Sequence, residues 1–285
     1  MKRSVYATWL IIPGMAIFGI FFILPTLLSF FFSLTVWNLQ EWRFVGLDNF
    51  KMFFAEPSLR GAITNTLIYA VLTSGFKTAL ALVIAVGLAS KLPTRNFLRS
   101  VIFFPTIVST VAIGIVFSSL MHPKRGVINA ALAVLGIAGP DWLGNGNLAL
   151  YSVIMVDIWR GIGMAMMIYL AGISAIPIEY GEALVVDGGN AWDEFRHITL
   201  PLLRPSMNSV IILSFIGGLR SFDLIWAMTG GGPGFATEIL SSLVYKQYIS
   251  GFYGLSTAGN IILLVLVAAL ALPLHIRLTK REVDL

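Results

Sequence analysis

The chain has 285 residues, of which 57% are hydrophobic and 12% charged, and its mean hydropathy is +0.86. Soluble proteins carry about a quarter charged residues, so this composition excludes an ordinary soluble domain and indicates a membrane protein. The absence of cysteine excludes disulfides, cysteine zinc sites, iron–sulfur clusters and thiol nucleophiles. A net charge of +5 also occurs in nucleic-acid-binding proteins, but in a membrane protein it reflects basic loops held on the cytoplasmic side.

Six segments are long and apolar enough to cross a membrane as α-helices, which requires about 20 residues. The first follows Lys2-Arg3 and carries no charge. It is far too long for a signal peptide, and no small-x-small cleavage site follows it. We therefore expect a single transmembrane domain over residues 1–285, an all-α polytopic membrane protein. The predicted spans are residues 9–34, 63–89, 100–121, 148–174, 206–228 and 256–277.

Other features mark the ends and bends of these spans. Residues 126–140 are apolar but too short to cross, so we expect a short helix packed at the outer surface. Indole rings favour the headgroup region, and tryptophans lie near the predicted outer span ends at Trp37, Trp42, Trp142 and Trp226. Prolines in or at spans predict kinks whose freed carbonyls are met by neighbouring helices: Pro13, Pro25, Pro105 and Pro273.

Six spans place both termini on the same side of the membrane. The connections on that side carry more Lys and Arg than those on the other, and the positive-inside rule then places both termini in the cytoplasm. The connection at residues 90–100 carries the most weight, because it holds Lys91, Arg95 and Arg99 and no acidic residue.

The connection between the fourth and fifth spans, residues 176–205, is unusually long and rich in helix formers. Pro177 ends the preceding span, and Pro201 and Pro205 close the segment. Residues 178–187 and 190–198 each suit about two helical turns, and Gly188-Gly189 supplies the break, since glycine tolerates the backbone angles of a sharp turn. On helix pattern alone, an ordinary surface loop is an equal alternative.

The residues of this connection resemble a known signature. Glu182-Ala183-Leu184, then Gly188, then Ile198-x-Leu200-Pro201 is similar in spacing to the EAA motif of permease subunits of binding-protein-dependent ABC importers, with Leu184 in place of the usual second alanine. The resemblance implies the type I ABC importer permease fold with six transmembrane helices. It also implies that the connection is a coupling segment that docks into a cleft on a separate ATP-binding subunit. The implied coupling residues are Glu182, Ala183, Asp187, Gly188, Ile198, Leu200 and Pro201.

Further motifs resemble the carbohydrate-uptake branch of these permeases: residues 44–50 (FVGLDNF), Phe222-Asp223, and residues 229–233 (TGGGP) followed by Thr237. This resemblance implies import of a sugar or sugar-like solute across the bacterial inner (plasma) membrane by alternating access. The implied partners are a second homologous permease, two ATP-binding subunits, an extracytoplasmic solute-binding protein and the lipid bilayer, with no role for nucleic acid.

Ionisable side chains within spans are costly and indicate function by default. Away from the span ends there are five: Lys77, Asp157, Arg160, Arg220 and Asp223. Asp157 and Arg160 can pair on one helix face, either along a pathway or as a structural ion pair. Arg220 and Asp223 can pair with each other or lie in hydrated surroundings.

The resemblance implies that two helix stripes line the translocation pathway: Asp157, Arg160, Gly161 and Met164 on the fourth span, and Ser214, Gly218 and Ser221 on the fifth. For the second stripe, close helix packing through small residues is an equal alternative.

Catalytic chemistry is not indicated. The sequence contains no G-x-x-x-x-G-K-[ST] loop, so we expect no cofactor in this chain, with ATP and Mg bound by partner subunits. His122, His197 and His275 are too scattered for a metal site, and no G-x-S-x-G elbow occurs. We therefore predict a translocase subunit that is not an enzyme. A gradient-driven secondary transporter and a membrane-embedded enzyme are the alternatives, and neither requires the EAA motif.

Overall fold

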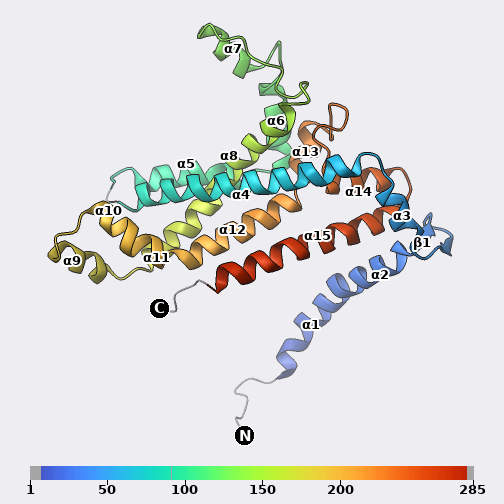
Figure 1. Cartoon of the computed structure of the whole chain (residues 1–285), viewed down its shortest axis with the longest axis horizontal. Coiled ribbons are helices and arrows are strands. Elements are labelled where there is room, and N and C mark those ends of the chain that lie inside the picture. The colour runs from blue at the N-terminus through green and yellow to red at the C-terminus, as the bar shows by residue number, and fades with distance from the viewer. Residues whose placement is uncertain (1–7, 91, 281–285) are drawn as a thin grey trace. The chain divides into compact units, whose positions relative to one another are not determined.

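The computed structural model describes residues 8–90 and 92–280, so the expected positions of the termini and of Lys91 lie outside the described residues. Helices dominate the fold (Figure 1). The chain divides into two compact units. The first contains the described residues up to Leu59 together with Leu243–Val265, and the second contains Arg60–Ser242 together with the described residues from Leu266 onward.

Four helical segments are long and apolar enough to cross a membrane: Trp9–Ser33, Leu59–Ala89 (α4), Ala149–Ser174 (α8) and Tyr253–Thr279 (α15). Two bent pairs also qualify if each is taken as one span. Arg95–Ile107 (α5) meets Thr110–Leu120 (α6) at 97°, and residues 191–202 meet Arg204–Leu219 (α12) at 64°. The described residues thus hold up to six spans, the number predicted.

The first span is a series of helical segments: η1 (Thr8–Ile11), α1 (Ile12–Phe18), a π-helical turn η2 (Gly19–Ile23) and α2 (Leu24–Ser33). Pro13 and Pro25 lie at the starts of α1 and α2 within one continuous helical run, where each lacks the backbone N–H that would bond to the preceding turn. The prolines therefore coincide with changes of helix type. Pro273, by contrast, lies inside α15, which continues through it.

A small extramembrane structure completes the first unit. An antiparallel hairpin pairs β1 (Thr35–Trp37) with β2 (Trp42–Phe44), and α3 (Asp48–Phe54) follows. The Asn49 side chain donates to the backbone carbonyls of Ser33 and Thr35, each at 2.8 Å, and so ties α3 to the end of α2. The motif at residues 44–50 therefore has a structural role. In the same unit, the Trp37 ring packs on Tyr253 of α15 with centroids 5.7 Å apart.

The second unit is built on close contacts between α4, α5, α8 and α12. A Cβ at Gly218 of α12 would lie 2.6 Å from Ala70 Cα of α4, and the Ser74 hydroxyl of α4 donates to the Ile211 carbonyl at 3.1 Å. A Cβ at Gly163 of α8 would lie 2.7 Å from Phe103 Cα of α5. Small residues allow this approach because they leave room for the backbone of the neighbouring helix. Such close packing matters in a bilayer, where burial of apolar side chains drives helix association only weakly.

Two predicted spans differ from the structure. Residues 100–121 were expected to be continuous, but Val108 and Ser109 are extended and separate α5 from α6. The helix at 206–228 ends at Leu219, and α13 (Asp223–Met228) begins after a short non-helical stretch. There the Ser221 carbonyl accepts a hydrogen bond from the Ser241 hydroxyl. The second break thus coincides with a hydrogen bond to a residue 20 positions away in the sequence.

The apolar stretch at 126–140 contains the expected short helix, α7 (Val127–Val134), in which Val134 is 86% exposed. Trp142 is partly buried, and its indole N–H donates to Asn129 Oδ1 at 2.7 Å. The remaining described helices are α9 (Ile178–Val186), α10 (Ala191–Glu194), a π-helical turn η3 (Phe195–Thr199), α11 (Leu200–Leu202) and α14 (Leu240–Ile249).

Replacing Gly218 by alanine is expected to destabilise the protein. The methyl group would force α4 and α12 apart, and overpacking of this kind costs about 1–3 kcal/mol. The helix-propensity gain from Gly to Ala is smaller, about 1 kcal/mol. The melting temperature of the purified protein in detergent measures the effect. Gly217→Ala is the matched control, because a Cβ at Gly217 meets nothing within 4 Å. Equal melting temperatures for the two variants would contradict the packing argument.

Candidate functional site

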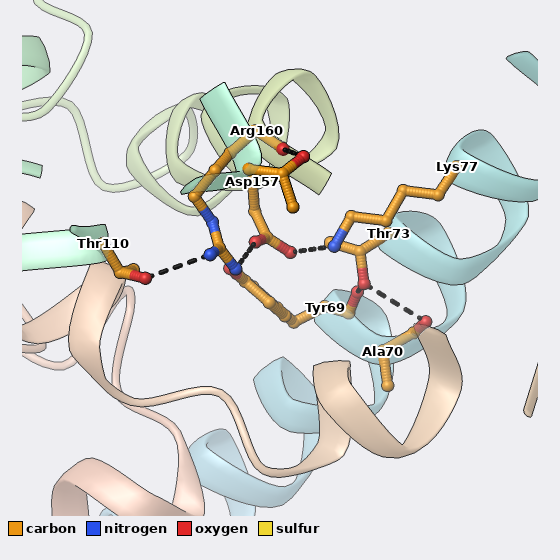
Figure 2. Close-up of polar contacts among 8 residues, drawn as sticks. Tyr69, Ala70, Thr73, Lys77, Thr110, Asp157 and Arg160 are labelled. Atoms are coloured by element: carbon orange, nitrogen blue, oxygen red, sulfur yellow. Dashed lines mark hydrogen bonds and ion pairs between the residues drawn. The ribbon is translucent and has the colours of Figure 1, made fainter. Parts of the chain in front are cut away.

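A buried ion network joins α4 to α8 in the second unit. Lys77 Nζ lies 2.7 Å from Asp157 Oδ2, and Arg160 Nη2 lies 3.3 Å from Asp157 Oδ1 (Figure 2). The predicted Asp157–Arg160 pair is therefore present, and Lys77 adds a partner that the sequence did not indicate. The Lys77 and Asp157 side chains are 10% and 7% exposed, whereas that of Arg160 is 26% exposed. Removing one partner of a buried pair leaves an uncompensated charge, which is strongly destabilising.

Gly161 makes room for this network. A Cβ at Gly161 would lie 2.6 Å from Lys77 Cε and 2.9 Å from Nζ, so the lysine side chain passes directly over the glycine. Gly161 was predicted from its place in a stripe, and the structure gives it a steric role. Tyr69 lies below the carboxylate, fully buried, with its ring directed toward Asp157 (Figure 2).

Arg160 contacts both sides of the break between α5 and α6. Its Nη1 donates to Thr110 Oγ1 of α6 at 3.0 Å, and its backbone carbonyl accepts from Thr106 Oγ1 of α5 at 3.0 Å (Figure 2). Thr106 and Thr110 were not among the predicted site residues. Their signal in the sequence is weak, since an isolated threonine in an apolar helix usually bonds its own backbone.

A cavity of about 350 Å³ adjoins the network. Of the seven residues predicted for the pathway, six line it: Asp157, Arg160, Gly161, Met164, Ser214 and Ser221. Gly218 does not line the cavity, because it faces Ala70 of α4, which agrees with the alternative that this stripe serves close helix packing. Its neighbour Gly217 lines the cavity instead. Arg220 and Asp223 also line it, and within the described residues no ion pair joins them.

The segment at residues 176–205 forms the predicted helix–break–helix arrangement. Helix α9 ends at Val186, and Gly188 has φ +81°, a left-handed conformation that favours glycine. The second piece begins at Asn190, whose side chain caps the backbone N–H groups of Trp192 and Asp193, while Asp193 caps Asn190 in return. It continues from α10 through η3 into α11, and so does not stop at residue 198.

The exposed surface of this segment contains most of the predicted coupling residues. Glu182, Ala183, Asp187 and Gly188 are exposed, whereas Ile198, Leu200 and Pro201 are half-buried. The apolar Val185 and Val186 side chains are 71% and 87% exposed, which is a large apolar exposure for so short a helix. Glu182 and Ile198 also line a second cavity of about 940 Å³ that reaches Arg95 and Arg99 of α5.

Metal chemistry has no site in the described part of the chain, where no three His, Asp or Glu side chains are placed to hold an ion. The cavity is instead a space among helices, lined by apolar side chains such as Met164 and Leu213 together with a few polar groups. It offers a carboxylate, guanidinium groups and hydroxyls, which can bind and release a polar solute but provide no activated nucleophile.

Comparison with known proteins gives the family. Residues 77–277 match the model of the binding-protein-dependent transport system inner membrane component. The chain is 33% identical to the trehalose/maltose transport system permease protein MalF of Thermococcus litoralis, over 90% of this chain and 88% of that protein. It is 31% identical to the multiple sugar-binding transport system permease protein MsmF of Streptococcus mutans, over 96% and 94% of the two chains. Its fold is similar to that of a chain in the crystal structure of a bacterial ABC transporter involved in the import of the acidic polysaccharide alginate, with a TM-score of 0.84, 22% identity and coverage of 95% and 94%. This chain therefore belongs to the family of binding-protein-dependent transport system inner membrane components: it is a membrane-embedded permease subunit of an ABC importer, with the type I permease fold, and not an enzyme.

Proposed function

We propose that this permease subunit carries a sugar or sugar-like solute through the cavity beside Asp157 and Arg160. It works with a second homologous permease, two identical ATP-binding subunits and an extracytoplasmic solute-binding protein. ATP and Mg are bound by the ATP-binding subunits, and this chain holds no cofactor. The chain lies in the bacterial inner (plasma) membrane with both termini in the cytoplasm, as the basic connection at residues 90–100 favours.

One observation carries the proposal: the cavity and the coupling segment lie on the same two helices. Asp157 and Arg160 are on α8, and Ser214 and Gly217 are on α12. The segment at residues 176–205 joins the end of α8 to the start of α12. Along α8 the separation from Asp157 to the helix end is about 25 Å at 1.5 Å per residue. A movement imposed on the segment is therefore transmitted by rigid helices to both cavity walls.

The chemistry of the cavity suits a polyhydroxylated solute. Sugars present closely spaced hydroxyls that both donate and accept, and the lining offers a carboxylate from Asp157, guanidinium groups from Arg160 and Arg220 and hydroxyls from Ser214 and Ser221. A volume of about 350 Å³ is at the lower end for small-molecule sites. We expect the second permease to complete the site. The relatives named as trehalose/maltose and multiple sugar-binding transport system permeases support this substrate class.

The exposed surface of α9 provides the contact with the ATP-binding subunit. Glu182 supplies a carboxylate for the basic groups of the partner, and the bare backbone at Gly188 permits close approach. Val185 and Val186 supply apolar area, which an interface buries at its centre. Closure of the ATP-binding pair then moves the segment and alternates the access of the cavity.

Changing Gly188 to valine is expected to abolish copurification of the ATP-binding subunit while the permease remains in the membrane. A β-branched residue resists a φ of +81°, so the segment must change shape where it meets its partner. Copurification from detergent-solubilised native membranes, followed by mass spectrometry, measures this. Gly136→Val is the matched control, because Gly136 has φ +73° and open space around it but lies beyond α7. If both variants retain or both lose the ATP-binding subunit, the coupling assignment fails.

Changing Arg160 to alanine is expected to reduce ATP-dependent uptake at least tenfold, since a charge-assisted hydrogen bond to a solute is worth more than 1.4 kcal/mol. The amounts of copurified ATP-binding subunit should stay unchanged.

The substrate class is tested with the wild-type protein. Proteoliposomes containing the complete importer and its binding protein would be tested with radiolabelled trehalose, maltose, maltotriose, sn-glycerol 3-phosphate and alanine. Uptake of one or more sugars supports the proposal. Uptake of alanine alone, or uptake that follows an ion gradient without ATP, overturns it.

A further inference from the structure

Lys77 is the member of the ion network that was not among the residues predicted for the pathway, although it lines the same cavity as Asp157 and Arg160. Its Nζ bonds Asp157 Oδ2 at 2.7 Å, the usual length for a charge-assisted hydrogen bond. The other carboxylate oxygen, Oδ1, is held by Arg160 at 3.3 Å, longer than that range. Asp157 is therefore neutralised chiefly from α4, and its bond with Arg160 is the weaker one.

This asymmetry decides where the Arg160 guanidinium lies. A buried carboxylate without Lys77 would need its charge compensated, and Arg160 is the nearest remaining cation. Arginine binds carboxylates best through two parallel N–H groups, so it would turn fully onto Asp157 and give up its bond to Thr110. With Lys77 in place, Arg160 instead stays spread between Asp157 and Thr110 at the cavity wall.

We propose that Lys77 is a positioning residue of the translocation pathway: it holds Asp157 from α4 and thereby keeps the Arg160 guanidinium at the cavity wall, where a solute hydroxyl can replace its weak bond to Asp157. The inference rests on the function proposed above. Gly161 supports it independently, because the end of the lysine side chain passes over this position on its way to Asp157 and would have to shift if a Cβ were present. The site thus contains a specific gap that keeps Lys77 in place.

The first test separates positioning from structural support by kinetics. In proteoliposomes with trehalose and maltose, Lys77→Met should raise the KM for uptake about tenfold and leave Vmax within about twofold, since one charged contact with the solute is lost. Lys77→Arg, which retains a cation for Asp157, should restore the KM to within about threefold of the wild-type value. Lys51→Met is the matched control, because Lys51 also pairs with an aspartate, at 2.9 Å, but on an exposed surface. An unchanged KM with a lower protein yield would show that Lys77 is only structural.

The second test needs no solute. A cryo-electron microscopy structure of the complete importer carrying Lys77→Met should show Arg160 bound to Asp157 through two nitrogens and detached from Thr110. If Arg160 keeps its bond to Thr110, the proposal is overturned even if the KM rises, because Lys77 would then contact the solute itself. If the wild-type importer takes up neither sugar, the proposed substrate class fails. The position of Arg160 in the cryo-electron microscopy structure of the Lys77→Met importer still decides the role of Lys77.

Discussion

The neutralisation of Asp157 by Lys77 is the interaction on which the rest of the membrane-embedded structure depends. A charged group inside a bilayer costs about 2.5–3.5 kcal/mol on insertion scales, and two such groups are tolerated here because each satisfies the other. The pair fixes α4 against α8, and the end of the Lys77 side chain passes close to Gly161. On the same face of α4, one to two turns before Lys77, Ala70 and Thr73 pack closely on Gly218 of α12. The cavity exists between α8 and α12 because α4 holds both.

The cavity also depends on two interruptions of helical structure. Beside it, α5 ends before α6 begins, and α12 ends before α13 begins. Irregular backbone is tolerated at membrane depth only where it lines a cavity or is buried in protein, and both breaks meet this condition. At the first, Thr106 and Thr110 bond to Arg160. At the second, the Ser221 carbonyl is bound by Ser241. Arg160 and Ser221, which line the proposed pathway, thus make hydrogen bonds at the two breaks between helices.

The features predicted from sequence are those with local causes. Hydropathy identified the spans, and the coupling segment was foreseen because Gly188 and the proline boundaries act within a few residues. Pro105 predicted a kink in the span at 100–121, but no local signal indicated extended backbone at Val108 or the end of α12 before Arg220. Lys77 was recognised as an ionisable residue within a span, but its pairing with Asp157 was not foreseen, because one sequence does not say which helices are neighbours. Ser214 and Ser221 were correctly predicted to line the cavity. Gly218 was predicted to line it as well, but Gly217 does so instead. The two glycines are one helical step of about 100° apart, and the spacing in the sequence did not fix which of them faces the cavity.

The separation of Lys77 from Asp157 along the chain, 80 residues, has a consequence for biogenesis. Synthesis at about 5–20 residues per second means that α4, which ends at Ala89, is complete roughly 3–14 seconds before Asp157 leaves the ribosome. During that interval Lys77 lacks its Asp157 partner, and an ammonium at the centre of a membrane-spanning helix costs about 2.5–3.5 kcal/mol on insertion scales. The apolar length of α4 offsets this cost, so the helix can enter the lipid before α8, and the pair of helices gains stability when the two charges meet.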